Sequence, residues 1–147
     1  MKLLDQSETV VVVVGTGGQR PERDRALADS LRLEIDRRGQ GLTYRRAVVI
    51  DDSAFLERQE LHRHPTITIG GPGVNQVAGY YVADLPTVWE DANRSFVQAE
   101  LDGGLKRVAL WGSDARATAA AVDAFVSDGH LEALLERIWR LRSDLMM

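Results

Sequence analysis

The sequence predicts an α/β fold, a three-layer, mainly parallel sheet of the Rossmann or flavodoxin-like kind flanked by helices. Three segments predict it, at residues 10–18, 65–76 and 108–114, because each runs from apolar residues through a small-residue turn into a polar helix start. Repeated strand-turn-helix units of this kind are typical of parallel sheets. The 147 residues suit one domain. We therefore expect a single α/β domain over residues 1–147.

The first half of the chain is expected to supply three strands. Five valines at 10–14 predict a strand in the middle of the sheet, because a strand apolar on both faces needs cover on both sides. A helix at 22–38 should follow, with Leu27, Leu31 and Ile35 on one stripe. The remaining elements expected here are a strand at 47–50, a short helix at 54–61 capped by Ser53, and a strand at 66–69.

The second half mixes helices with a hairpin. A helix is expected at 75–82, and residues 84–93 fit either a loop or a short edge strand. Alternating residues at 95–101, a glycine turn and an apolar run at 107–111 predict an antiparallel hairpin. Helices should follow at 115–127 and from 131 onward, the last with a wide apolar face.

Composition narrows the classes of function. The formal charge of -4 and the pI near 5.4 argue against nucleic-acid binding, which rests on a net basic face. No apolar run is long enough to span a bilayer, and the first nine residues do not resemble a signal peptide. Cysteine is absent, which fits a reducing compartment. We expect a soluble, cytoplasmic protein with no nucleic-acid or membrane partner.

Candidate ligand-binding residues lie where the expected strands end. The carboxyl ends of parallel strands meet at one edge of the sheet, and ligands bind there. That edge would gather Gly15, Thr16, Gly17, Gly18, Asp51, Gly71, Gly73, Asn75, Ser113 and Asp114. Free amides of glycine turns attract anions, so this edge fits a small anionic ligand, with Arg20, Arg23 and Arg25 adding positive charge. The interpretation that we favour is that the glycines only make tight turns.

The sequence contains no complete motif for a known cofactor or for a known type of catalysis. The dinucleotide-binding fingerprint is Gly-x-Gly-x-x-Gly. When it is aligned on Gly15, its third glycine position holds Arg20, and when it is aligned on Gly71, that position holds Gln76. The sequence has neither a P-loop nor the Gly-x-Ser-x-Gly turn of serine hydrolases. The sequence therefore identifies no cofactor and no catalytic residue.

Two pairs of residues invite metal chemistry. Asp51 and Asp52 fit a magnesium site or an aspartyl nucleophile, and also an acidic helix cap, which we favour. His62 and His64 would share a face on an extended segment and could bind zinc, but a third ligand is not near them in sequence, so surface histidines are the preferred interpretation. We expect no metal site.

Two segments resemble a known family. IGGPGVN at 69–75 and VALWGSDARATAAAV at 108–122 are similar to the paired motifs of α/β domains in archaeal surface-layer proteins and their relatives. The resemblance covers roughly the second half of the chain and implies a structural or interaction domain with no catalytic residues to carry over. Trp111 stands where that family has a small residue, and a secretion signal is lacking, so a cytoplasmic module that uses the same turns is expected.

Two hypotheses about function follow. The first is a non-catalytic binding or interaction module, with a homodimer formed through the apolar face of residues 131–147. The second is a small nucleotide- or phosphate-binding protein, or an enzyme, with Asp51 as a polar anchor. The second requires a concave site with free amides at the strand-end edge.

Overall fold

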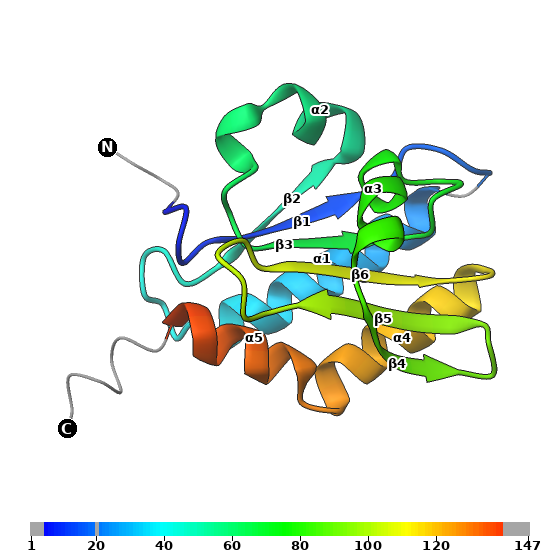
Figure 1. Cartoon of the computed structure of the whole chain (residues 1–147). Helices are drawn as coiled ribbons and strands as arrows, with labels where there is room; N and C mark the ends of the chain where they lie inside the picture. The colour runs from blue at the N-terminus through cyan, green and yellow to red at the C-terminus, as the bar shows by residue number, and fades with distance from the viewer. Residues whose placement is uncertain (1–4, 20, 140–147) are drawn as a thin grey trace.

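Residues 5–19 and 21–139 are described by a computed structural model of the chain. They form a six-stranded sheet in the order β2-β1-β3-β6-β5-β4 (Figure 1). The strands are β1 (Val10–Val14), β2 (Ala47–Asp51), β3 (Thr66–Ile69), β4 (Thr87–Asp91), β5 (Ser95–Glu100) and β6 (Arg107–Gly112). The first four in spatial order are parallel, and β5 and β4 are antiparallel to their neighbours. The predicted α/β fold and its antiparallel C-terminal part are confirmed.

Helices lie against both faces of this sheet. They are α1 (Pro21–Arg38), α2 (Asp52–Glu57), the 3-10 helix η1 (Gln59–Leu61), α3 (Gln76–Asp84), α4 (Ala115–Ser127) and α5 (His130–Trp139). In Figure 1, α1, α4 and α5 lie on one side of the strands, and α2 and α3 lie on the other. Since β1 leads to α1 on one face and β3 leads to α3 on the other, the connections diverge between these neighbouring strands.

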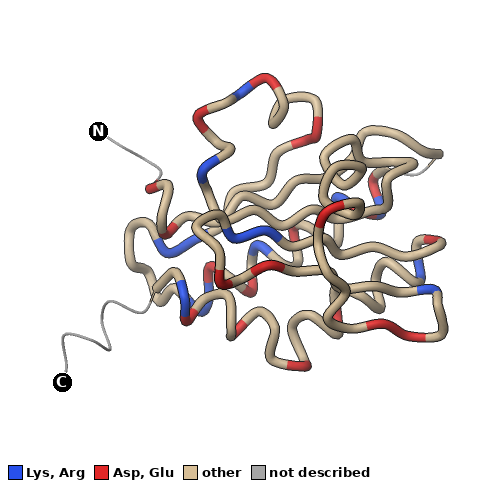
Figure 2. Tube along the Cα trace, viewed as in Figure 1, with Lys and Arg blue, Asp and Glu red and all other residues tan. Residues whose placement is uncertain are grey.

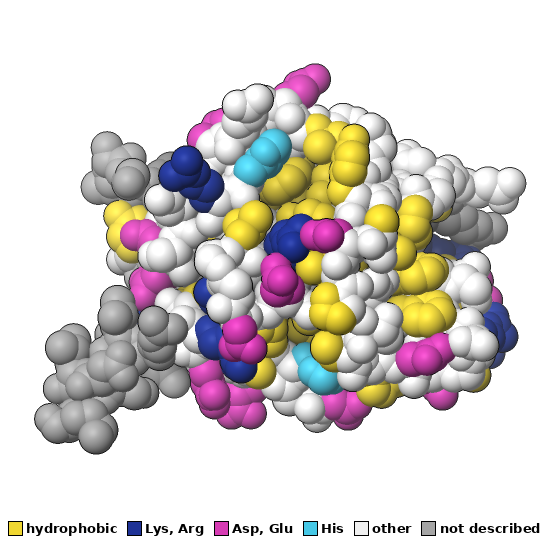
Figure 3. Space-filling view, viewed as in Figure 1, with side chains coloured by type: hydrophobic (Ala, Val, Ile, Leu, Met, Phe, Trp, Pro, Cys, Tyr) yellow, Lys and Arg dark blue, Asp and Glu magenta, His cyan; other side chains and the backbone are white. Residues whose placement is uncertain are grey.

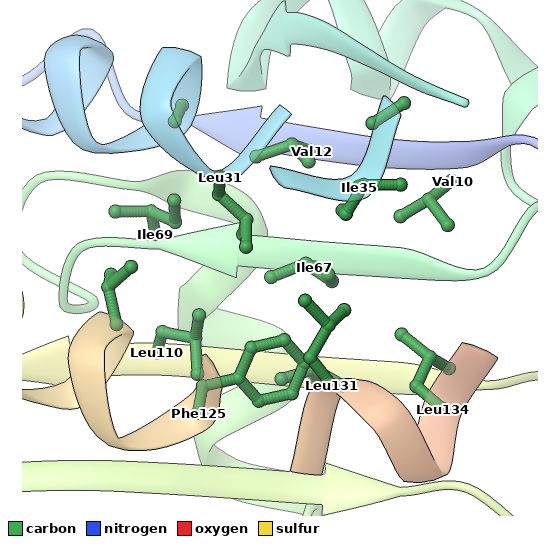
Figure 4. Close-up of a cluster of buried hydrophobic side chains, with 14 of the residues drawn as sticks. Val10, Val12, Leu31, Ile35, Ile67, Ile69, Leu110, Phe125, Leu131 and Leu134 are labelled. Atoms are coloured by element: carbon green, nitrogen blue, oxygen red, sulfur yellow. The ribbon is translucent and has the colours of Figure 1, made fainter. Parts of the chain in front are cut away.

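Alternate valines of β1 enter two different cores. Val10 and Val12 belong to the core that α1, α4 and α5 cover, and Figure 4 shows Val12 beside Leu31 and Val10 beside Ile35. Val11 and Val13 pack on the other side, among residues of α2 and α3. Successive side chains of a strand point to opposite faces, so a strand covered on both sides is apolar throughout.

Three details differ from the sequence prediction. The valine strand β1 is not central: β2 alone lies on one side of it, because the antiparallel strands extend the sheet on the other. The expected helix at 54–61 is split into α2 and η1 around Arg58, and its cap is Asp51 rather than Ser53. Residues 87–91, left open between loop and strand, form the edge strand β4.

The apolar face of α5 is covered by the protein's own core. Leu131, Leu134, Leu135 and Trp139 are buried against the sheet face that also carries α1. The apolar residues of 131–139 that were predicted to form a dimer surface are therefore buried inside the protein. The rest of the predicted surface, residues 140–147, lies outside the described residues. Over 5–19 and 21–139, no helix has the length and apolar character needed to cross a membrane.

Candidate functional site

A cleft of about 680 Å³ lies at the carboxyl ends of the parallel strands. Its walls come from the loops after β1, β3 and β6 and from the first turns of α1 and α4. This is the edge on which the connections from β1 and β3 diverge to opposite faces of the sheet. Such a point is where open α/β sheets bind their ligands.

Six of the ten predicted site residues border the cleft. They are Gly17, Gly18, Gly71, Gly73, Ser113 and Asp114. The other four, Gly15, Thr16, Asp51 and Asn75, are not among the residues that line it. The sequence therefore located the edge of the sheet, whereas the individual side chains divide between the cleft and the packing beneath it.

The glycine turn after β1 is held under the loop that follows β3. The Gly17 amide donates to the Val74 carbonyl at 3.1 Å. A Cβ on Gly15 would lie 1.9 Å from the same Val74 oxygen, so only glycine fits there. The Gly17 amide is thus occupied by the protein's own backbone and is not free for an anion.

Asn75 joins the ends of two neighbouring strands. Its Nδ2 donates to the carbonyls of Val13 at 3.1 Å and Ile69 at 2.9 Å, and its Oδ1 accepts from the amides of Val77 and Ala78 at the start of α3. The side chain is 1% exposed. With every polar group of the side chain bonded inside the protein, Asn75 acts as a helix cap and strand clamp.

The acidic pair at the end of β2 stabilises the fold around the cleft. Asp51 caps α2 by accepting from the Ala54 amide at 2.7 Å. Asp52 is 1% exposed, and its carboxylate accepts from the Thr16 hydroxyl at 3.0 Å and the Gln76 amide at 2.8 Å. Asp52 thus connects the loop after β1 with the start of α3. This role was not evident from the sequence, because the bonded groups are distant along the chain.

Ser113 and Asp114 are bound to an arginine from another loop. Arg94, between β4 and β5, donates from Nη2 to Asp114 Oδ2 at 2.5 Å and from Nε to Ser113 Oγ at 3.3 Å. Asp114 also caps α4 through the Ala117 amide at 2.8 Å. That backbone hydrogen bond, with Arg94 nearby, holds the pKa of Asp114 below its ordinary value. The sequence analysis missed Arg94, since only the hairpin brings it to this edge.

Asp24 is a partly buried acid in the cleft that the sequence analysis did not single out. It lies in the first turns of α1, and its carboxylate occupies the space above Gly70, where an added Cβ would lie 2.6 Å from Oδ2. Burial raises the pKa of Asp24 above its ordinary value. Within the described residues, its carboxylate has neither an ion pair nor a hydrogen bond. A perturbed acid in a cleft is a signature of functional sites.

Two open glycines, a cation and an aromatic ring complete the cleft. The amides of Gly71 and Gly73 make no hydrogen bond to a described residue, and exposed Arg23 lies near Asp24. Trp111 stacks on Phe96 with ring centroids 4.4 Å apart. Figure 3 shows hydrophobic side chains gathered over the strands beside α3.

Of the other two arginines that were predicted to add positive charge at this edge, Arg25 is paired with Asp29. Arg20 lies outside the described residues.

The histidines considered for zinc bind backbone carbonyls. His62 Nε2 lies 2.7 Å from the Phe55 carbonyl, and His64 Nδ1 lies 2.9 Å from the Thr9 carbonyl. His64 is buried rather than on the surface, which differs from the preferred interpretation. In the described part of the chain, no three His, Cys, Asp or Glu side chains are grouped as a metal site would need.

Comparison with known proteins adds no assignment. No protein-family model matches this chain, and no curated protein matches it. The inferences about function therefore depend on the cleft and its chemistry.

Proposed function

We propose that this protein binds a small polar molecule of the nucleotide or sugar-phosphate class in the strand-end cleft. The observation that carries this proposal is the cleft itself, about 680 Å³ between three strand-end loops. Ligand pockets commonly measure about 300–1,000 Å³. On this proposal, the mixed sheet serves as a flavodoxin-like scaffold with its ligand at the divergence of the connections.

The groups around the cleft favour a ligand that is part anion and part polyol. Arg23 offers a guanidinium to phosphate oxygens, and the Gly71 and Gly73 amides add uncharged donors. Asp24 would repel a bare phosphate, but its carboxylate is suited to accept hydrogen bonds from sugar hydroxyls. The ring of Trp111 supplies apolar surface on the same wall. A simple inorganic anion would leave Asp24 without a role.

Binding, rather than catalysis, is the role proposed. The hydroxyl oxygen of Ser113 accepts a hydrogen bond from Arg94, and this donor lowers the nucleophilicity of the oxygen. Asp114 is engaged as a helix cap and in an ion pair. These contacts support a site in which the polar groups hold a ligand in position.

Thermal unfolding against nucleotides, sugar phosphates and inorganic phosphate tests the proposal. A ligand at about 100 times its dissociation constant should stabilise the protein by about 2.7 kcal/mol and raise the midpoint by several degrees. Gly73→Val should abolish that shift. Nothing lies within 4 Å of a Cβ at this position, so the valine side chain would occupy space in the cleft that the ligand needs.

Gly79→Ala is the matched control, since Gly79 is exposed on α3 and its Cβ also meets nothing within 4 Å. It should retain the full ligand shift. The cleft proposal would be contradicted if no nucleotide or sugar phosphate shifted the unmodified protein more than inorganic phosphate does, or if that extra shift were undiminished in Gly73→Val.

A protein partner, including a second copy of the chain, is the second candidate. Tyr80 on α3 and Val88 on β4 are 68% and 47% exposed. The surface-layer resemblance and the homodimer remain predictions. Solution mass with and without Tyr80→Ser tests self-association: a dimer that dissociates in the variant supports it, and a monomeric unmodified protein contradicts it.

A further inference from the structure

A second cavity lies at the opposite end of the sheet from the cleft. It measures about 260 Å³. Its walls come from the segments that precede β1, β3 and β6 and from the last turn of α5. The two sites are thus separated by the length of the parallel strands, and neither depends on the loops that form the other.

Three of the described residues that line this cavity are cations: Arg63, Lys106 and Arg137. None of its described lining residues is acidic, although the whole chain carries a net charge of -4. Blue segments in Figure 2 lie at the end of the sheet where β1, β3 and β6 begin. A recess lined by one sign of charge focuses the field and raises the local concentration of the opposite ion.

Two of these cations have no compensating charge among the described residues. Lys106 Nζ donates to the Gly103 carbonyl at 2.7 Å, which is a neutral acceptor. Arg63 is exposed and forms no ion pair with a described carboxylate. Both groups therefore retain donors for an incoming anion.

The third cation and the nearby acids set the local balance. Arg137 pairs through Nε with Asp102, whose side chain is 86% exposed. On the other wall, the Ser7 hydroxyl donates to Asp5. Arg137 also offsets the negative end of the α5 dipole. Among the described residues, Arg63 and Lys106 are not offset by a carboxylate, so the described wall of the recess carries positive charge.

We propose that this cavity binds a small oxyanion of the phosphate type, either free phosphate or the phosphoryl group of a small ester. Arginine and lysine are the side chains that recognise phosphate, arginine through two parallel hydrogen bonds and lysine as a point charge. The volume is below that of pockets for drug-sized molecules, which start near about 300 Å³, and so favours a small anion.

Calorimetric titration of the full chain with inorganic phosphate, and separately with glycerol phosphate, tests this inference at constant ionic strength. Arg63→Gln and Lys106→Gln should each weaken phosphate binding about tenfold or more, since each removes a charged contact. Gly104→Val should also weaken it, because Gly104 borders the cavity with nothing within 4 Å of its Cβ. Tighter binding of the ester than of phosphate would identify a phosphoryl group as the natural occupant.

Arg58→Gln makes the same change in net charge at an exposed site outside the cavity, and it should leave affinity within about twofold. Gly73→Val should leave affinity unchanged, because it alters only the cleft. No phosphate binding at millimolar concentration, or equal losses in Arg58→Gln and Lys106→Gln, would overturn the inference. Loss in Gly73→Val alone would also overturn it and would place the anion in the cleft instead.

Discussion

The glycine-rich loops after β1 and after β3 look alike in sequence and differ in the structure. The first, at residues 15–18, lies under Val74, whose carbonyl accepts from Gly17 and leaves no room for a side chain on Gly15. In the second, residues 71–73 border the cleft, as Gly17 and Gly18 of the first loop do, but a Cβ on Gly73 would meet nothing within 4 Å.

This difference separates two uses of glycine. In the first loop, glycine permits close approach of two backbone segments, so it is required for packing. In the second loop, the backbone at Gly73 is accessible and its amide is free of described partners, so the same residue type leaves a surface on which a ligand can sit. Glycine content alone does not distinguish a packed loop from a loop that is open to a cleft.

The largest expected effect is on the free energy of unfolding, in a comparison of Gly15→Ala with Gly73→Ala. The methyl group of Gly15→Ala would lie 1.9 Å from the Val74 oxygen, so the loops must separate. We expect a loss of about 3 kcal/mol or more in the free energy of unfolding, measured in urea. Gly73→Ala should change it by less than about 0.5 kcal/mol. Similar losses in both variants would refute the contrast between the loops.

A smaller effect is expected at Asn75, which follows the second loop in sequence and bonds to the ends of both β1 and β3. Asn75→Ala removes the cap of α3 and leaves the Val13 and Ile69 carbonyls without their Nδ2 donor. We expect a loss of about 2–3 kcal/mol in urea unfolding. Asn75→Asp keeps a capping oxygen but lacks the donor, and it should also be destabilising at neutral pH. Full stability in Asn75→Asp would show that only the cap matters.

The smallest effect concerns Asp24, whose carboxylate faces the second loop. Because burial raises its pKa above 3.8 in the folded state, the folded protein holds this proton more tightly than the unfolded chain. Stability is therefore lost as pH rises through the folded pKa, and the penalty persists at neutral pH.

Asp24→Asn removes that penalty, and the start of α1 offsets part of the gain because it favours an acid. For a half-exposed group, we expect a gain below about 1 kcal/mol at pH 7 that disappears below pH 3.8. Urea unfolding at both pH values checks this. A variant less stable than the parent at pH 7 would contradict the sign.

Local pattern was sufficient for most elements. The five valines of β1, the strand Thr66–Ile69 and the helix Ala115–Ser127 lie where the sequence predicted them. Apolar runs, alternation and capping residues act over a few neighbours, so the sequence displays them directly. The edge strand β4 was not decided, because its residues are mostly exposed and lack an apolar pattern.

The residues that line the candidate cleft were predicted only in part. The edge of the sheet follows from the rule that parallel strands end together, and six predicted residues border the cleft there. The sequence analysis did not single out Asp24 or Arg94. Asp24 borders the cleft, and Arg94 binds Ser113 and Asp114, only because the fold brings distant elements together. Asp24 resembles any acid in the first turn of a helix, and Arg94 resembles any charged residue in a hairpin turn.

The sequence by itself determined the α/β class, the strand-end turns and the edge of the sheet at which those turns gather. The tertiary structure decided the strand order, the burial of the apolar face of α5, and which glycine amides at the strand ends are hydrogen-bonded inside the protein. It also brought three cations together at the other end of the sheet. Backbone preference and hydrophobic period are local properties, whereas an open cleft or a charged recess exists only where distant loops meet across the sheet.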